Sequence, residues 1–322
     1  MAVTQIKQLL SHLDSQVIGQ TELTQSIVIA LLADGHILVE GPPGLAKTRA
    51  INALSDGIDA NFHRVQFTPD LLPADLTGTD IYRPETGEFI FQQGPLFHNL
   101  VLADEINRAP AKVQSALLEA MAERQITVGS KTYNLPELFL VMATQNPLEQ
   151  EGTYPLPEAQ LDRFLMHVEI DYPNADTELK ILKLNRGESL NEINHALPKD
   201  VAKLSQLDIK SARKSILEIH MSEAIETYIV QLIMATRQPQ AYSDELREWI
   251  EIGASPRATI ALERCARAHA WLNGRDFVAP EDVQAMLENV LRHRLILSYQ
   301  AQAQGINANK VIASISQLVP VP

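Results

Sequence analysis

The sequence contains a single cysteine, Cys265, among 322 residues. One thiol excludes a disulfide framework and a thiolate metal cluster, and its helical, partly apolar neighbours predict a buried, inert side chain. No apolar run reaches the length of a membrane span, because polar residues such as Asp34 and Glu40 interrupt the longest runs. The N-terminal segment, residues 1–16, is amphipathic and lacks the apolar block of a secretion signal. These absences predict a cytoplasmic protein.

Positive charge and aromatic rings are also scarce. The chain has 27 Lys and Arg against 40 Asp and Glu, a formal net charge of -13, and only 5% of its residues are aromatic. This balance repels nucleic-acid backbones, and so few rings do not provide a base-stacking platform. The nine histidines show no HExxH spacing, and no GxSxG elbow is present. The composition therefore argues against a nucleic-acid partner, a zinc hydrolase and a serine hydrolase.

The first half of the sequence alternates apolar runs with helical patterns, as βαβ units do. Four runs predict buried strands of a parallel sheet, at residues 36–41, 63–68, 99–104 and 138–145. Pro110 opens a helical pattern between the last two, because proline is tolerated in the first turn of a helix. The apolar content of 45% is sufficient for a large core.

Two alternating segments, residues 79–91 and 125–135, interrupt this rhythm. Each surrounds a glycine-containing turn and predicts a β-hairpin inserted into the α/β domain. Phe89 and Phe91 lie on the first hairpin. Because strand aromatics usually contribute to packing, we expect both rings to hold the hairpin against its own domain and not to grip a substrate.

The strand patterns fade after the first half, and the polar stretch at residues 189–200 predicts a linker. The remaining sequence is helical. One helix is capped by Ser255 and a second begins at Pro280. We therefore predict an α/β domain over residues 1–190, and a linker with an all-helical domain over residues 191–322.

The stretch HILVEGPPGLAKT, residues 36–48, combines a strand, a glycine-rich turn and a helix start, which is the context of a phosphate-binding loop. The backbone amides at the helix N-terminus favour an anion there. Lys47 is long enough to reach the β- and γ-phosphates, and Thr48 offers a hydroxyl ligand to Mg²⁺. The expected nucleotide contacts are Gly41, Pro42, Pro43, Gly44, Leu45, Ala46, Lys47 and Thr48.

Ala46 stands where the strict phosphate-loop pattern has a second glycine. Glycine is required at this position only if φ is positive or if a side chain would collide with its surroundings. The departure therefore leaves the nucleotide site in place unless the backbone or the neighbours exclude a methyl group.

Polar side chains follow two other predicted strands. Asp104 and Glu105 end one apolar run, at the edge where open α/β sheets bind ligands. Adjacent buried acids need a cation or donors, so we expect Asp104 to hold Mg²⁺, partly through water, and Glu105 to act as general base on the attacking water. Asn146 ends the next run, where it can bond the γ-phosphate and that water.

The ordered motifs GPPGLAKT, VLADE, ATQNP, LPEAQLDRF and GASPRA resemble those of the MoxR family of AAA+ ATPases, over nearly the whole chain. Members of that family commonly carry alanine before the phosphate-loop lysine. The resemblance implies a P-loop AAA+ core with a C-terminal helical lid, ATP and Mg²⁺ as ligands, and a homo-hexameric ring. It also implies that the two hairpins face the central pore of the ring.

The resemblance also implies roles for individual residues. Asn146 is the expected sensor 1, Arg163 the arginine finger that reaches the nucleotide of a neighbouring subunit, and Arg257 the sensor 2 on the lid. Val17 and Ile18 match the segment that packs near the adenine.

The implied function is ATP-driven remodelling or maturation of a client protein, by loading of a metal or cofactor, with a separate partner that carries a von Willebrand A domain. Two alternatives remain open. One is a nucleic-acid motor of the same clade, against which the acidic composition argues. The other is a nucleotide-switched scaffold with little turnover, against which Glu105 and Asn146 argue.

Overall fold

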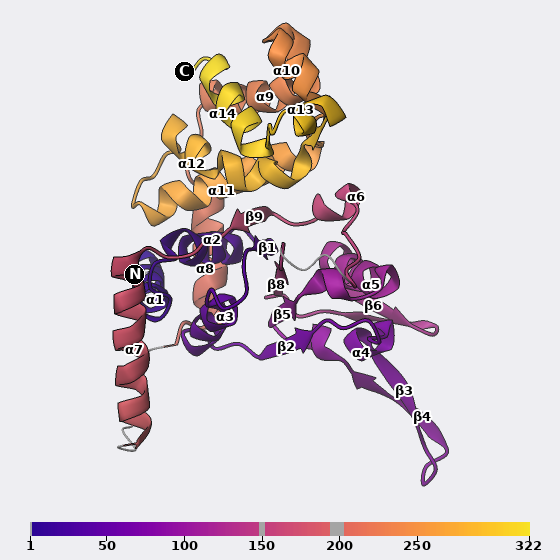
Figure 1. Cartoon of the computed structure of the whole chain (residues 1–322). Helices are drawn as coiled ribbons and strands as arrows, with labels where there is room; N and C mark the ends of the chain where they lie inside the picture. The colour runs from indigo at the N-terminus through magenta and orange to yellow at the C-terminus, as the bar shows by residue number, and fades with distance from the viewer. Residues whose placement is uncertain (1, 148–151, 194–202) are drawn as a thin grey trace.

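The computed structural model describes residues 2–147, 152–193 and 203–322. Its central sheet contains β1 (Ile37–Glu40), β2 (Phe62–Gln66), β5 (Leu100–Asp104), β8 (Leu140–Gln145) and β9 (Met166–Glu169). The spatial order is β2-β5-β8-β1-β9, and all neighbours are parallel (Figure 1). The four strands that the sequence predicts are confirmed. The edge strand β9 is not apparent in the sequence, because His167 and Glu169 interrupt its short apolar run.

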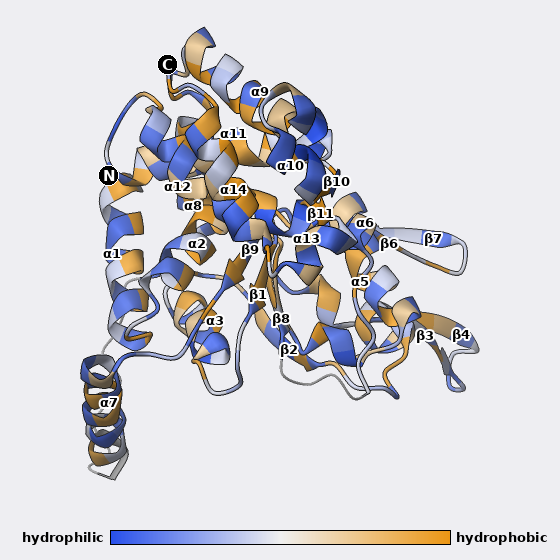
Figure 2. Ribbon diagram, turned by 45° about the horizontal axis from the view of Figure 1, so that its top comes forward, coloured by the Kyte–Doolittle hydropathy of each residue, from blue (hydrophilic) through white to orange (hydrophobic). Residues whose placement is uncertain are grey.

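Alternate side chains of the strands enter two separate cores on the two faces of the sheet. In β1, Ile37 and Val39 point into one core and Leu38 points into the other. Figure 2 shows the corresponding apolar segments between the sheet and its helices. The first core includes residues of α1 (Ala2–Gln16), α2 (Thr21–Leu32), α3 (Lys47–Asp56) and α8 (Gln206–Leu217). The second includes residues of α4 (Pro73–Thr77) and α5 (Ala111–Glu123).

The C-terminal part of the chain is helical, and its apolar side chains continue the first core. Ser255 caps its longest helix by accepting a hydrogen bond from the backbone N–H of Arg257 at 3.1 Å. The helices are α9 (Glu223–Arg237), α10 (Asp244–Trp249), α11 (Pro256–Leu272), α12 (Pro280–Leu291), α13 (Tyr299–Ala303) and α14 (Ala308–Leu318). A short antiparallel pair of strands, β10 (Ile250–Ile252) and β11 (Ile296–Leu297), accompanies them. We call α9 to α14 the helical lid.

Both predicted hairpins are present and extend from the same side of the core (Figure 1). The first consists of β3 (Gly78–Arg83) and β4 (Glu88–Gln93), and the second of β6 (Gln125–Val128) and β7 (Lys131–Asn134). Phe91 stacks on Tyr133 with ring centroids 4.2 Å apart, so this ring packs as expected. The expectation for Phe89 is wrong. Its side chain is 68% exposed, because it lies near the tip of the hairpin, beyond the reach of the core.

The linker expected at residues 189–200 is only partly described. Residues 189–193 belong to α7 (Ala175–Ile193), so the prediction is wrong for them, and residues 194–202 lie outside the described part of the chain. Glu188 on α7 forms an ion pair with Arg49 on α3, which holds the helix near its end against the core. The domain boundary at residue 190 stays a prediction.

The single cysteine has the environment that the sequence predicts. Cys265 is fully buried in α11, and burial raises the pKa of its thiol to about 12. A thiol with so high a pKa carries almost no thiolate and is inert. No helix in the described ranges has the length and apolarity required to cross a membrane. The cytoplasmic location inferred from composition stays a prediction.

Candidate nucleotide site

The carboxyl ends of β1, β5 and β8 meet at one edge of the sheet (Figure 1). The glycine-rich loop follows β1, the two acids follow β5, and Asn146 follows β8. The ammonium group of Lys47 donates to the carbonyl oxygens of Gly41 at 2.7 Å and Gln145 at 3.1 Å. Burial lowers the pKa of Lys47, while Asp104, Glu105 and Glu40 oppose the shift. The structure therefore brings together the motifs that the sequence places at three strand ends.

The loop uses its small residues in different ways. Ala46 has φ +58° and ψ 18°, so it adopts the left-handed conformation that glycine favours, at a cost of about 1–2 kcal/mol for an L-residue. Gly44 has φ +83° and open space where a Cβ would lie. Gly41 is required for another reason, since its Cβ would lie 2.6 Å from the backbone oxygen of Ile170. The first glycine thus permits close packing beside β9.

Asp104 is held by two side chains that lie outside the sequence motifs. The hydroxyl of Thr144 donates to Asp104 Oδ1 at 2.6 Å, and Arg64 Nη2 donates to Asp104 Oδ2 at 2.7 Å. Thr144 also accepts the backbone N–H of Glu105 at 2.9 Å. The signal for Thr144 is a hydroxyl residue within the otherwise apolar run of β8.

Glu105 has φ +57° and is half-buried. Its carboxylate accepts hydrogen bonds from Gln66 Nε2 at 2.7 Å and Arg108 Nη1 at 3.0 Å. Gln66 is the last residue of β2, whose register places it beside Asp104. These donors hold the carboxylate at the sheet edge, near the acid that we expect to bind the metal.

Asn146 is 4% exposed and lines a cavity of about 270 Å³ at the same edge, together with Glu40 and Asn107. The carboxylate of Glu40 lies 3.0 Å from Nε2 of His167 on β9, and this contact lowers the pKa of Glu40. The cavity therefore has polar side chains in its wall and adjoins the start of the glycine-rich loop through Glu40.

Val17 and Ile18 lie in the turn between α1 and α2. Val17 is buried in the first core, and Ile18 is half-buried. Arg49, in the first turn of α3, donates to the backbone and side-chain oxygens of Gln16. The segment is thus tied to the helix that follows the glycine-rich loop, and its contact with adenine stays a prediction.

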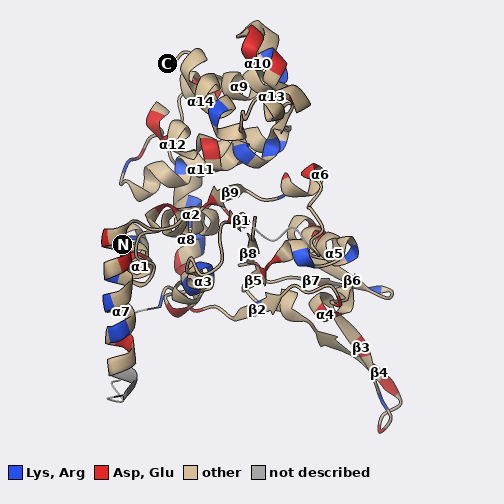
Figure 3. Ribbon diagram, viewed as in Figure 1, with Lys and Arg blue, Asp and Glu red and all other residues tan. Residues whose placement is uncertain are grey.

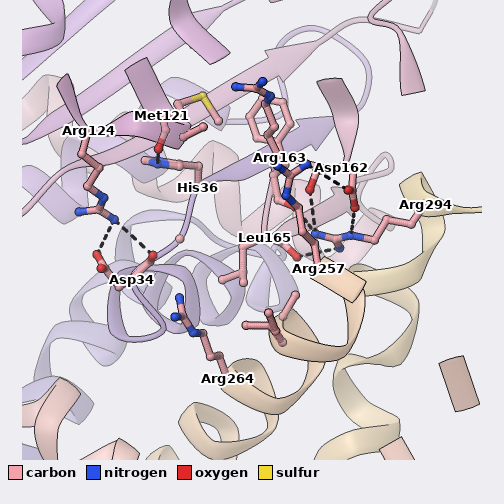
Figure 4. A pocket seen from close by; sticks show the side chains of 15 residues that line it. Asp34, His36, Met121, Arg124, Asp162, Arg163, Leu165, Arg257, Arg264 and Arg294 are labelled. Carbon is pink, nitrogen blue, oxygen red and sulfur yellow. Dashed lines mark hydrogen bonds and ion pairs between the residues drawn. The ribbon is translucent and has the colours of Figure 1, made fainter. Parts of the chain in front are cut away.

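Arg163 and Arg257 do not lie at this edge. Both line a pocket of about 290 Å³ whose wall includes Gly35 and His36, the residues before β1 (Figure 4). Lys47 follows the carboxyl end of β1, whereas this pocket lies at its amino end. The two arginines therefore lie on the side of the sheet where the parallel strands begin. There, Arg163 Nη1 donates to the carbonyl oxygen of Leu118 at 2.8 Å, and Arg257 Nη1 donates to the carboxylate of Asp162 at 3.3 Å.

Comparison with known proteins identifies the family of the chain. Residues 36–166 match the profile of the "ATPase family associated with various cellular activities (AAA)", and residues 246–315 match that of the AAA lid domain. The chaperone MoxR1 of Mycobacterium tuberculosis is 43% identical over 307 residues, which are 95% of this chain and 79% of MoxR1. The chain belongs to the MoxR family of AAA+ ATPases.

Two further proteins extend the comparison. YeaC of Bacillus subtilis, whose function is uncharacterized, is 42% identical to this MoxR-family chain over 97% of the chain and 93% of YeaC. A crystal structure of a candidate ATPase from Cytophaga hutchinsonii has a TM-score of 0.91 and 45% identity, over 100% of this chain and 96% of that one. As a MoxR-family AAA+ ATPase, the protein binds nucleotide and is an enzyme that hydrolyses ATP.

Proposed function

We propose that this MoxR-family ATPase hydrolyses Mg²⁺-ATP between subunits of a hexameric ring. The observation that carries the proposal is the separation of the two arginines from Lys47 by the length of β1. A nucleotide on the loop of one subunit needs cations that Arg163 and Arg257 of that subunit are poorly placed to supply. A neighbouring subunit supplies both arginines when the side of its sheet where the strands begin faces the nucleotide.

The side chains at the sheet edge fit a magnesium ion bound to phosphates. Mg²⁺ in such sites takes one or two protein oxygens and completes its shell with phosphate oxygens and water. Thr48 contributes a hydroxyl at the start of α3, and Asp104 contributes a carboxylate that is already oriented by Thr144. Bound there, the ion would neutralise charge on the phosphates.

The protein groups then have distinct tasks. Lys47 binds the β- and γ-phosphates in exchange for its two carbonyl partners. Glu105 accepts a proton from the attacking water, and Asn146 orients that water against the γ-phosphate. Arg163 and Arg257 of the neighbouring subunit stabilise the charge that develops as the phosphoryl group transfers.

The output that we propose is remodelling or maturation of a client protein, with loading of a metal or cofactor. The similarity to a protein named a chaperone supports this function. A separate protein with a von Willebrand A domain is the partner that we expect. The β3–β4 hairpin carries the acids Asp80, Glu85 and Glu88 against one basic residue, Arg83 (Figure 3), and this acidic balance favours a protein client over a nucleic acid. Stimulation of hydrolysis by DNA would favour the motor instead.

Mixing two inactive variants tests the shared site. Arg163→Ala protein keeps its loop and lacks its arginine, whereas Lys47→Ala protein lacks a working loop and keeps its arginine. Because an arginine supplied in trans is worth about 10³–10⁵ in rate, the mixture should release phosphate much faster than the sum of the separate proteins. A mixture no faster than that sum would overturn the proposal, and little turnover by the unmodified protein would favour the scaffold.

A further inference from the structure

One carboxylate joins the core to the helical lid beside the two arginines. Asp162 follows the short helix α6 (Glu158–Leu161) and immediately precedes Arg163. Its Oδ2 accepts from Ser255 Oγ at 2.8 Å and from Arg257 Nη1 at 3.3 Å. Its Oδ1 accepts from Arg294 Nε at 2.9 Å. Both oxygens are therefore bonded to residues of the lid segment.

Arg294 adds further hydrogen bonds to this junction. Its side chain is 2% exposed, and its guanidinium also donates to the backbone oxygens of Phe164 at 2.6 Å and Leu165 at 3.1 Å. The peptide segment around Arg163 is thus bound on both sides by one buried guanidinium. Figure 4 shows Asp162 between Arg294 and Arg257, with Arg163 adjacent.

The pocket contains more arginines than acids, and Asp162 is the acid beside Arg257 and Arg294. Its wall carries five arginines and two acids, Asp34 and Asp162. Asp34 is engaged by Arg124 at 2.8 Å and by Arg213 at 2.7 Å. Asp162 is therefore the acid of the pocket wall that offsets the repulsion between guanidinium groups near Arg163 and Arg257.

We propose that Asp162 is a positioning residue that sets Arg163 of the core and Arg257 of the lid in one arrangement, so that both reach the neighbouring nucleotide together. Without this carboxylate, Arg257 loses its bond to the core and is repelled by the guanidinium groups beside it. The inference rests on the proposed function, because it concerns how a subunit donates its arginines. It predicts a defect in donation and none in the nucleotide site of the same subunit.

The test compares arginine donors. Arg163→Ala protein is the acceptor, and Lys47→Ala protein is the reference donor. Displacement of a catalytic group by about 1 Å can cost about 10²-fold in rate. A Lys47→Ala/Asp162→Asn donor should therefore restore a kcat about 10- to 100-fold below the kcat that the reference donor restores. The KM for ATP should not change, because the acceptor site is intact. A Lys47→Ala/Asp34→Asn donor is the matched control, because it removes the other acid of the pocket. It should equal the reference, since Asp34 pairs with Arg124 and Arg213.

Folding and ring assembly are checked separately. The single Asp162→Asn variant should bind nucleotide as the unmodified protein does and elute at the same size. If Asp162→Asn does not fold, because Arg294 is left without its carboxylate, the donor Lys47→Ala/Asp162→Asn/Arg294→Met removes the unpaired charge and should still donate poorly. A folded donor without Asp162 that matches the reference overturns this inference alone. A reference donor that restores nothing overturns the proposed function and this inference together.

Discussion

The hydroxyl of Thr144 donates a 2.6 Å hydrogen bond to the carboxylate of Asp104. The same oxygen accepts the backbone N–H of Glu105 at 2.9 Å, and Thr144 is 1% exposed. One buried hydroxyl on β8 therefore sets both acids at the end of β5. The position of the expected metal ligand and of the expected general base depends on a neighbouring strand.

Thr144→Val removes this hydroxyl and keeps the shape of the side chain. We expect turnover to fall about 10- to 100-fold because both acids lose their alignment, with little change in nucleotide affinity. Stability should fall by about 1–3 kcal/mol, since two buried groups lose a partner. Phosphate release and urea unfolding measure the two effects. Thr144→Ser keeps the hydroxyl and should restore turnover; equal rates for Val and Ser would contradict the assignment.

Glu105→Gln keeps the size of the side chain and removes its basicity. Because a general base contributes about 10²–10⁴-fold, we expect phosphate release to slow by that factor while calorimetry still detects ATP binding. Glu119→Gln, an exposed acid on α5, makes the same charge change and should leave turnover unaltered. Turnover of Glu105→Gln at the unmodified rate would remove this residue from the mechanism.

Ala46→Gly tests the left-handed backbone of the loop. Glycine relieves the conformational cost of φ +58° but loses more entropy on folding, so we expect a change between zero and about 1 kcal/mol in favour of the folded state. Ala53 lies in the interior of α3, the helix that follows the loop. Ala53→Gly should therefore destabilise the protein by about 1 kcal/mol or more. Thermal or urea unfolding separates the two. Similar losses for both variants would show that Ala46 is not strained.

His36 predicts a stability loss in acid. Its Nδ1 accepts the backbone N–H of Val141 at 3.0 Å. Burial, assisted by Arg124, lowers its pKa from 6.5 to about 4. The unfolded chain therefore takes up a proton first as the pH falls below 6.5, and stability decreases until the folded pKa is reached. Between pH 7 and pH 5, protonation of His36 in the unfolded chain should lower the free energy of unfolding by about 2 kcal/mol.

His36→Asn isolates this contribution. Asparagine can accept a hydrogen bond from the same backbone N–H and does not titrate. Between pH 7 and pH 5, the free energy of unfolding of the variant should therefore fall by about 2 kcal/mol less than that of the unmodified protein. Urea unfolding at both values measures the difference. His293, whose pKa burial also lowers, is present in both proteins and cancels. An identical pH dependence would show that His36 does not titrate as described.

Local patterns predicted much of the fold. The four apolar runs, the two hairpins and the helix capped by Ser255 are present where the sequence indicates, because burial on both sheet faces, tight turns and helix caps each require particular residues in short range. The strand β9 is one element that these patterns did not predict. Its four residues carry too weak a pattern, and their place in the sheet depends on pairing with β1, which is distant in sequence.

The sequence by itself determined which chemical groups are present: a loop lysine, two acids after one strand, an amide after another, and two arginines. Only the tertiary structure decided which of them meet. Lys47, Asp104 and Asn146 share one edge because parallel strands end together, whereas Arg163 and Arg257 lie at the other end of β1. Contacts such as Thr144 with Asp104 and Arg294 with Asp162 join distant segments, and no local periodicity encodes them.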